Sequence, residues 1–327
     1  MPIAYEPARC PVCAGADSRE IADADALRRE ADERRTFPLR RLTPSAPPAA
    51  LADRVAFSEP PPLRIVACRR CDTLYRNPRE RERSVLDTFA GEQPDPEALR
   101  SLFDAQLPFF QRRARELTRL AGRAGRALEV GSYTGAFLAA AALQGWNVLG
   151  IDVNPHAVDA ARRRGLHART ARIEDIREHH AFDAIAFWTC FDHLPDPRPT
   201  LRVARDLLTP GGILALRVPN GRFYERLRRL RGIARPIARG LLAHTNMLAF
   251  PYRHGFNPRS LRLLLRDQGF TILRLRGDTL LPATAWTRPW AALERRLTHA
   301  LTRTLTPFLP PWLDLYATPL PSPARLH

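Results

Sequence analysis

The sequence predicts an α/β fold with a doubly wound, mostly parallel sheet, preceded by a small cysteine-containing module. From residue 126 onward, apolar runs of strand length alternate with helix-forming segments. This alternation is typical of parallel strands joined by crossover helices on both faces of a sheet. Two Cys-x-x-C pairs lie before residue 90, and the 327 residues suffice for one substantial domain and a small accessory module.

The first strand, glycine loop, helix and second strand are predicted within residues 127–152. In order, the segments are an apolar run at 127–130, Gly131 and Gly135, helix formers at 136–143, and a second apolar run at 147–151. Asp152 follows Gly131 by 21 residues, close to the separation at which a carboxylate meets a pair of ribose hydroxyl groups. This segment therefore predicts a nucleotide-binding half-fold.

The loop argues against a dinucleotide. In the pattern G-x-G-x-x-G/A, the middle glycine lets the backbone approach a pyrophosphate; here Gly131 is first, Ala136 is third, and Tyr133 holds the middle place. The pattern Glu129-x-Gly131-x-x-x-Gly135 instead resembles the first motif of Rossmann-like (class I) S-adenosylmethionine-dependent methyltransferases. In that family the loop passes under a methionyl group and carries no phosphate.

The resemblance continues in chain order. Asn154 is a plausible N-cap with Pro155 at the first helical position, as in the family's second helix. The later segments are a buried strand at 182–188, a Glu-His-x-x-Asp-Pro-like sequence at 191–197 with Asp192 in place of the glutamate, a Pro-Gly-Gly turn and strand at 208–220, a helix, Gly-Phe and strand at 260–276, and a closing antiparallel strand at 312–317. The resemblance implies a seven-stranded sheet and S-adenosylmethionine as cofactor.

The cofactor is expected at the carboxyl ends of the strands, where ligands bind in open α/β sheets. The expected cofactor-binding residues are Glu129, Gly131, Ser132, Gly135, Asp152, Val153, Ile173, Asp175 and Trp188. Arg172 stands where the family usually carries an acid for the adenine amino group. We therefore expect Asp175 or a backbone carbonyl to accept from adenine, with Ile173 against the ring.

Two histidines are candidate catalytic residues. Methyl transfer from a sulfonium depends mainly on alignment, and a general base helps when the acceptor loses a proton. His193 is placed for that role beyond the fourth strand, although it could instead cap the following turn. His254, before the late helix, is the second candidate.

Four of the five cysteines form two knuckles that predict a structural Zn²⁺ site, with Cys10, Cys13, Cys68 and Cys71 as ligands. Redox dithiols or unpaired cysteines are the alternative. A zinc ribbon before such a domain resembles an arrangement in bacterial enzymes, although Ala14 and Asp72 replace the glycine that commonly follows each knuckle. Cys190 is expected to be a small residue packed beside the cofactor.

These patterns divide the chain. The expected parts are a zinc-ribbon-like module at 1–90 with an inserted segment at 17–62, a helical linker at 91–125, a methyltransferase domain at 126–319 with insertions near 220–256 and 279–310, and a tail at 320–327. Within the first insertion, residues 24–35 are predicted to be helical and the following residues are proline-rich.

Charge and hydropathy bear on partners. The net charge is +17 and all 51 basic residues are arginine, so nucleic acid is a conceivable partner that other features do not favour. Residues 222–239 could form a lid over an anionic substrate, a membrane-surface helix or a solvated face. An amphipathic helix at 290–304 could contact a membrane or pack on the sheet; its segment falls short of the roughly 20 apolar residues of a spanning helix.

The expected function is S-adenosylmethionine-dependent methyl transfer to a small molecule or a glycan or lipid precursor. The alternatives are an RNA methyltransferase and a non-catalytic cofactor-binding protein that docks partners through its zinc ribbon. Residues 1–9 lack an apolar core, so we expect no signal peptide. Because zinc-binding thiolates must stay reduced, we expect a cytoplasmic location.

Overall fold

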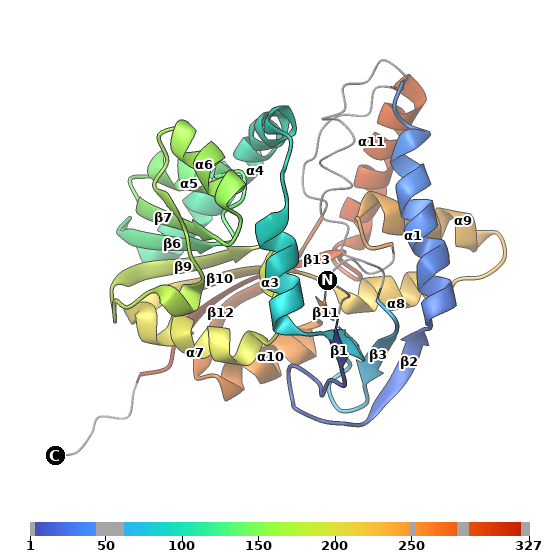
Figure 1. Ribbon diagram of the computed structural model, residues 1–327, viewed down its shortest axis with the longest axis horizontal. Coiled ribbons are helices and arrows are strands. Elements are labelled where there is room, and N and C mark those ends of the chain that lie inside the picture. The colour runs from blue at the N-terminus through green and yellow to red at the C-terminus, as the bar shows by residue number, and fades with distance from the viewer. Residues whose placement is uncertain (1–3, 44–61, 249–252, 280–287, 322–327) are drawn as a thin grey trace.

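The computed structural model describes residues 4–43, 62–248, 253–279 and 288–321 (Figure 1). The proline-rich part of the predicted first insertion lies at 44–61, outside these ranges. Three sheets organise the described chain: a large seven-stranded sheet, a four-stranded sheet and a two-stranded ribbon.

The large sheet has the strand order β12-β13-β10-β9-β6-β7-β8. Its strands are β6 (Arg126–Val130), β7 (Asn147–Asp152), β8 (Ala168–Thr170), β9 (Phe182–Trp188), β10 (Leu208–Pro219), β12 (Phe270–Asp278) and β13 (Trp312–Pro319). The pairs among β6 to β10 are parallel, whereas β13 runs antiparallel to both β10 and β12. This arrangement confirms the predicted fold class, including the closing antiparallel strand.

Helices cover both faces of this sheet, as Figure 1 shows. They are α4 (Pro96–Ala121), α5 (Ala136–Ala142) and α6 (Pro155–Arg163) on one face, and α7 (Pro197–Leu207) and α10 (Pro258–Asp267) on the other. Successive strand residues point to opposite faces, so Ala127 packs with the core of α4 and α5 and Leu128 with the core of α7 and α10. The predicted N-cap of α6 is confirmed, because the Asn154 side chain accepts from Ala157 N.

The N-terminal cysteine module is joined to the large domain by a shared sheet. This four-stranded sheet has the order β11-β4-β3-β2, with β2 at Ser18–Ala22, β3 at Ile65–Cys68, β4 at Leu74–Arg76 and β11 at His254–Gly255. β1 (Tyr5–Glu6) pairs with β5 (Arg79–Glu80) beside it. Since β11 comes from the segment between β10 and α10, the module and the large domain are bonded through backbone pairing.

Five further helices lie in the described chain. They are α1 (Ala24–Leu39), α3 (Glu82–Gly91), α8 (Gly221–Arg229), α9 (Ala234–His244) and α11 (Pro289–Leu305), with short 3₁₀ turns η1 (Ile173–Asp175) and η2 (Phe191–His193). A separate apolar cluster joins α1, α8 and α9 through Leu27, Tyr224 and Leu241. None of the described helices combines the length and hydropathy that crossing a bilayer requires.

The basic segment at 222–239 does not supply the wall of the main cavity. Arg228 donates to Glu30 over 2.7 Å, and Arg239 donates to Glu33 over 2.6 Å, so these arginines join α8 and α9 to α1. Residues 243–246, which come after the basic segment in the chain, line the cavity instead. The part of this insertion that approaches the site is therefore the C-terminal end of α9.

Candidate active site

A cavity of about 470 Å³ opens where β6, β7 and β9 reach their carboxyl ends, the expected ligand position in this kind of sheet. Its volume lies in the range of small-molecule sites. The wall includes eight of the predicted residues, which lie at the strand ends, in the loops after them or in η1 and η2: Glu129, Gly131, Ser132, Asp152, Val153, Ile173, Trp188 and His193. Gly135 and Asp175 are not part of this wall.

Two positions of the glycine loop have backbone conformations that favour glycine. Gly131 has φ +72°, and a Cβ there would lie 2.7 Å from the Cβ of Cys190. Gly135 has φ +78° and caps the start of α5. Tyr133 also has a positive φ, 37°, so a tyrosine adopts the left-handed region that favours glycine. The loop therefore keeps a glycine-like turn although it lacks the middle glycine.

Asp152 fixes this loop from the end of β7. Its Oδ2 accepts from Tyr133 N and its Oδ1 accepts from Asn154 N, each over 2.9 Å. Burial raises the pKa of Asp152, and these backbone donors oppose that rise. A carboxylate can accept about four hydrogen bonds, so Asp152 keeps capacity for a hydroxyl pair of a ligand.

Glu129 places a second carboxylate in the same cavity. It is 3% exposed, and its pKa is raised well above the usual range by burial and, secondarily, by the charge of Asp152. Among the described residues, Glu129 Oε2, Ser132 Oγ and Trp188 Nε1 have no hydrogen-bond partner. Buried polar atoms normally have partners, so these three wall groups indicate a ligand that carries positive charge and can also accept hydrogen bonds.

His193 faces the cavity from η2. Its Nε2 lies 3.8 Å from Oδ2 of the fully buried Asp192, and its ring meets that of Phe89 edge-on at 5.5 Å. The shorter side chain of Asp192, compared with the family's glutamate, still reaches the histidine.

His254 lies behind the site rather than in its wall. It is 4% exposed on β11, and its Nε2 donates to the Leu194 carbonyl over 2.8 Å. Burial lowers its pKa to about 3, so the ring is neutral near pH 7. His193 therefore lines the cavity, whereas His254 holds the segment that follows His193 in the chain.

Further contacts hold that segment, residues 192–198. Arg253 N donates to the Asp192 carbonyl over 3.0 Å, and the Arg79 guanidinium donates to the Pro195 carbonyl over 2.9 Å. The Arg198 guanidinium in turn donates to the Val12 carbonyl over 2.7 Å, inside the first cysteine knuckle. The cysteine module thus supports one wall of the cavity.

The opposite end of the wall contains η1. Ile173 is buried and lines the cavity, whereas the Asp175 carboxylate accepts from Arg172 N over 2.8 Å. The Arg172 guanidinium pairs with Glu82 of α3 over 2.6 Å and with Glu174 over 3.2 Å. Arg172 therefore braces this end against α3.

Cys190 is a packing residue in this structure. Its thiol donates to the Val130 carbonyl over 2.8 Å, and burial raises its pKa well above the usual range. The Cβ of Cys190 lies against Gly131. A buried, protonated thiol is inert, which agrees with its expected packing role.

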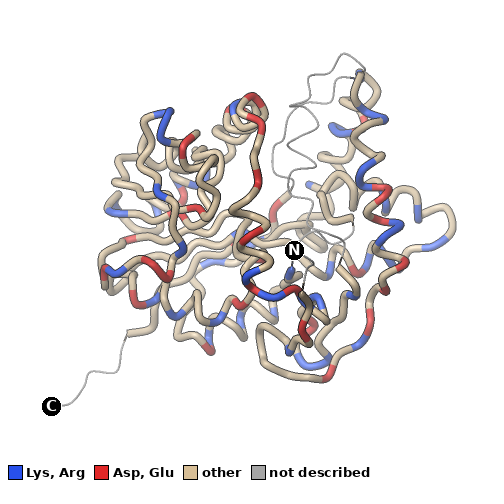
Figure 2. The backbone as a smooth tube through the Cα atoms, in the orientation of Figure 1, with Lys and Arg blue, Asp and Glu red and all other residues tan. Residues whose placement is uncertain are grey.

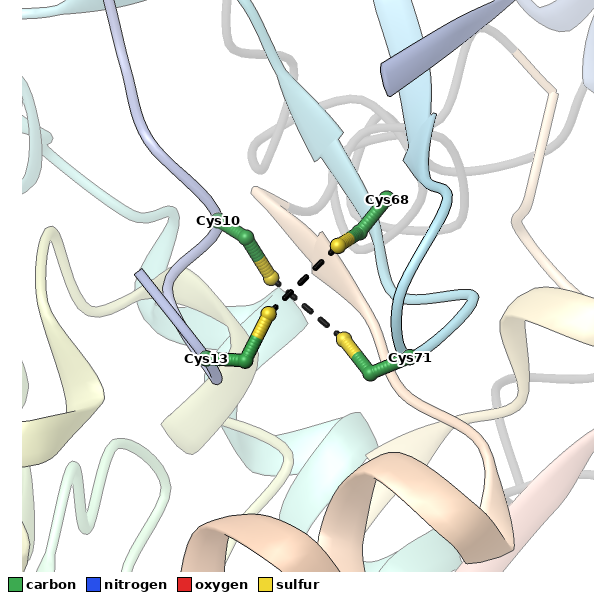
Figure 3. Close-up of side chains that lie close together, drawn as sticks. All are labelled: Cys10, Cys13, Cys68 and Cys71. Carbon is green, nitrogen blue, oxygen red and sulfur yellow. Dashed lines mark hydrogen bonds between the residues drawn. The ribbon is translucent and has the colours of Figure 1, made fainter. Parts of the chain in front are cut away.

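The other four cysteines converge on one point (Figure 3). Their Sγ atoms all lie within 4.8 Å of one another, with Cys10 and Cys71 3.5 Å apart and Cys13 and Cys68 3.5 Å apart. A zinc ion about 2.3 Å from each of four sulfurs separates them by about 3.8 Å. The cluster therefore fits a structural zinc ion with no open coordination position.

The knuckle turns explain how glycine is replaced. Ala14 and Asp72, at the positions usually held by glycine, have φ values of 56° and 57°. Their backbone N–H groups donate to the Cys10 and Cys68 carbonyls, each over 2.9 Å. Both turns therefore adopt the left-handed geometry that favours glycine.

Comparison with known proteins identifies the family. The family described as "Methyltransferase domain" matches residues 103–275, more than half of the chain. The chain belongs to this family. The class predicted from the glycine loop, Rossmann-like S-adenosylmethionine-dependent methyltransferases, is thereby confirmed.

Two curated relatives match part of this methyltransferase chain. The chain is 32% identical over 155 residues to the ubiquinone biosynthesis O-methyltransferase of Xylella fastidiosa, which is 44% of this chain and 61% of the relative. It is 34% identical over 110 residues to the protein of the same name from Xanthomonas campestris, 31% of this chain and 46% of the relative. These matches span less than two thirds of either relative.

Solved structures with a similar chain trace include other methyltransferases. An S-adenosylmethionine-dependent methyltransferase from Mesorhizobium loti is 21% identical, with a TM-score of 0.47, covering 66% of this chain and 99% of that one. The 1,6-didemethyltoxoflavin-N1-methyltransferase of Burkholderia thailandensis is 19% identical, with a TM-score of 0.41, covering 64% and 78%.

The cavity residues of this methyltransferase fit S-adenosylmethionine. The ligand's ammonium and sulfonium charges complement Glu129 and Asp152, and its ribose hydroxyl groups can use the remaining acceptor capacity of Asp152. Trp188 Nε1 and Ser132 Oγ can donate to it. The observed wall thus offers what this cofactor requires.

Several wall residues could not be predicted from the motifs. They come from α1, from α11 and from the C-terminal end of α9 with the two residues after it: Arg34, Phe37, Ala243, His244, Thr245, Asn246 and Arg295. Asn154 was recognised only as a helix cap, yet its Nδ2 also donates to the Phe89 and Glu92 carbonyls over 3.0 and 2.9 Å. No local pattern signals these contacts, because each depends on a distant segment.

Proposed function

We propose that this protein transfers the methyl group of S-adenosylmethionine to an oxygen of a small-molecule acceptor. The observation that carries the proposal is the single cavity that joins the glycine loop and Asp152 to His193. The curated relatives that support an oxygen acceptor are named O-methyltransferases. The cavity volume of about 470 Å³ supports a small molecule, or the soluble end of a glycan or lipid precursor, rather than an RNA segment.

The cofactor would lie along the carboxyl ends of β6 and β7. Glu129 would hold the methionyl ammonium group, Asp152 would accept from the ribose hydroxyl groups, and Ile173 would pack against the adenine. When bound, S-adenosylmethionine supplies a methyl group on a sulfonium whose departure leaves a neutral thioether. The chain's own residues therefore need to align the acceptor and exclude water, and to remove one proton.

His193 would remove that proton. The acceptor hydroxyl would give its proton to the His193 imidazole as its oxygen takes up the methyl group that the cofactor supplies. Asp192, with Oδ2 3.8 Å from His193 Nε2, would stabilise the resulting imidazolium. Arg253 and His254 act at a distance, by holding the backbone on either side of His193.

Calorimetric titration with S-adenosylmethionine and S-adenosylhomocysteine tests cofactor binding, and transfer of a radiolabelled methyl group to quinol-like and other phenolic acceptors tests activity. A well-folded protein that binds neither ligand would overturn the proposal. We expect His193→Ala to lower kcat/KM by about 10²- to 10⁴-fold, the usual contribution of a general base, with cofactor affinity unchanged. His156→Ala, an exposed substitution on α6, is the matched control.

The four-cysteine cluster is proposed to hold one zinc ion with a structural role. Support comes from the sulfur spacing, the closed ligand set and the hydrogen bonds between the module and residues 192–198. These hydrogen bonds favour a module that stabilises the active site over one that is free to dock a separate partner. Thiolates that bind zinc must stay reduced, which supports a reducing compartment such as the cytoplasm.

A further inference from the structure

Helix α11 carries an exposed apolar stripe. Trp290, Leu293, Leu297 and Leu301 are 50%, 57%, 62% and 41% exposed. Their spacings of three and four residues place all four side chains on one face of the helix. Single exposed leucines are ordinary, but a continuous apolar face indicates an interaction surface.

The opposite side of α11 packs on the protein. Ala291 and Thr302 are fully buried. Glu294 lies at the edge of the stripe, four residues after Trp290 and three before Leu297. It accepts two hydrogen bonds of 2.7 Å from the Arg41 guanidinium and lies 3.5 Å from His244 Nε2 at the end of α9. The helix is therefore anchored to α1 and α9 (Figure 1), and its apolar stripe is left outside rather than packed on the sheet.

Positive charge accompanies the stripe. Arg296 and Arg303 are exposed on α11, and Glu294, the one acidic residue of the helix, is engaged by Arg41. Helix α9 contacts α11, and the turn that precedes α9 carries exposed Ile233 and the exposed Arg231. Figure 2 marks arginines along α11 and at this turn.

We propose that the outer face of α11 binds the surface of an anionic lipid bilayer. The leucines and Trp290 would enter the boundary between headgroups and acyl chains, while Arg296 and Arg303 would contact the negative surface. Arginine stems can extend along apolar surface while their guanidinium groups stay at the interface. Helix α11 would bind in the plane of the interface rather than cross the bilayer, since it has 17 residues and lies along the protein.

A second copy of the chain fits the stripe less well. A two-fold contact through α11 would use the same patch from both copies. It would bring the uncompensated arginines of each copy into the same interface, where like charges repel. A negatively charged bilayer complements those charges instead.

Co-sedimentation of the full chain with vesicles tests the proposal. We expect binding to vesicles of phosphatidylcholine mixed with phosphatidylglycerol, weaker binding to phosphatidylcholine alone, and weakening by salt. The double variant Leu293→Ser/Leu297→Ser should bind at least about tenfold more weakly, because inserting each leucine side chain contributes roughly that factor or more. The control is Leu143→Ser, which changes a leucine that is 66% exposed at the end of α5.

Charge reversal separates the contribution of the arginines from that of the leucines. Arg296→Glu/Arg303→Glu should weaken binding to the anionic vesicles, whereas Arg262→Glu, on the exposed side of α10, should not. Circular dichroism and S-adenosylhomocysteine titration should show every variant folded and ligand-competent, because all of these side chains are exposed. Co-sedimentation measures membrane binding without any methyl transfer, so its result is independent of the proposed activity.

Three results would overturn the proposal. The first is a folded wild-type chain that does not bind the anionic vesicles, and the next is equal binding by Leu293→Ser/Leu297→Ser and Leu143→Ser. The last is sedimentation equilibrium that shows a wild-type dimer which the stripe variant dissociates, without vesicle binding. This last outcome would assign the stripe to a second copy of the chain.

Discussion

His254 Nε2 donates to the Leu194 carbonyl oxygen over 2.8 Å, so a strand paired with the cysteine module holds the segment that carries His193. The strand is β11, whose partner β4 follows directly after Cys71 in the chain. Asn257 adds a contact from its Nδ2 to the Cys71 carbonyl over 3.1 Å. Through these bonds, the module and the candidate active site form one continuous structure.

We expect the protein to lose stability as the pH falls below about 6.5, in part through His254. Its folded-state pKa of about 3 lies below the ordinary value of 6.5, so the unfolded chain takes up a proton that the folded chain excludes. The stabilising contribution is complete above pH 6.5 and is lost as the pH falls toward 3, at up to about 1.4 kcal/mol per pH unit.

Urea unfolding at several pH values measures this effect. His254→Gln, which keeps a side-chain donor for Leu194, should flatten the pH dependence. His244, with a pKa lowered to about 4 by burial, contributes in the same direction and should preserve part of the slope. An unchanged slope in His254→Gln would show that His254 does not titrate as proposed.

Glu129→Gln is expected to stabilise the cofactor-free protein while it weakens cofactor binding. The pKa of Glu129 is raised by burial, so its ionisation in the folded state opposes folding increasingly as the pH rises from its unfolded value toward its folded value. Removing the charge should raise the free energy of unfolding near pH 7 by on the order of 1 kcal/mol.

The same change removes a charged acceptor for the methionyl ammonium group, and binding should weaken about tenfold or more. Calorimetry with S-adenosylmethionine measures this loss. Asp159→Asn, an exposed carboxylate on α6, is the control and should leave both quantities unchanged. Equal affinity of Glu129→Gln and wild type would place the ammonium group elsewhere.

Cys13→Ser should abolish tight metal binding and destabilise the chain, because three thiolates leave the tetrahedral site open. Elemental analysis of the purified wild-type protein should give roughly one zinc per chain, as a single closed site requires. Cys190→Ser keeps all four ligands of the cluster and should retain the metal. A wild-type protein free of metal, with an unfolding midpoint unaffected by chelators, would argue for unliganded cysteines.

Arg217→Met should cost about 3–5 kcal/mol of stability, the usual effect of removing one partner from a buried ion pair. Arg217 and Asp314 both have fully buried side chains, and Nη1 of Arg217 lies 2.7 Å from Oδ1 of Asp314. Arg113 also pairs with Asp314 over 2.8 Å. Denaturant unfolding measures the loss, with Arg266→Met, an exposed substitution, expected to be near neutral.

Local patterns were sufficient to predict the large sheet and its glycine loop. The apolar runs at 127–130 and 182–188 are each followed by chain-reversing residues, and Asn154-Pro155 predicts the start of α6. Such signals are local, since burial on both faces demands continuous apolar strands and caps involve neighbouring residues. The paired cysteines likewise predicted their own cluster, because each knuckle needs only four residues.

Contacts between distant segments were decided by the tertiary structure. His193 and His254 look alike as candidates in the sequence, yet the fold turns one into the cavity and pairs the other with Leu194. The wall formed by α1, α9 and α11, and the exposure of the stripe on α11, also depend on packing across hundreds of residues. The sequence by itself determined the class of fold, the glycine loop and the two cysteine knuckles, whose physical requirements are local. Only the folded chain decided which polar groups share a cavity and which apolar face stays in contact with solvent, because those depend on how the helices dock.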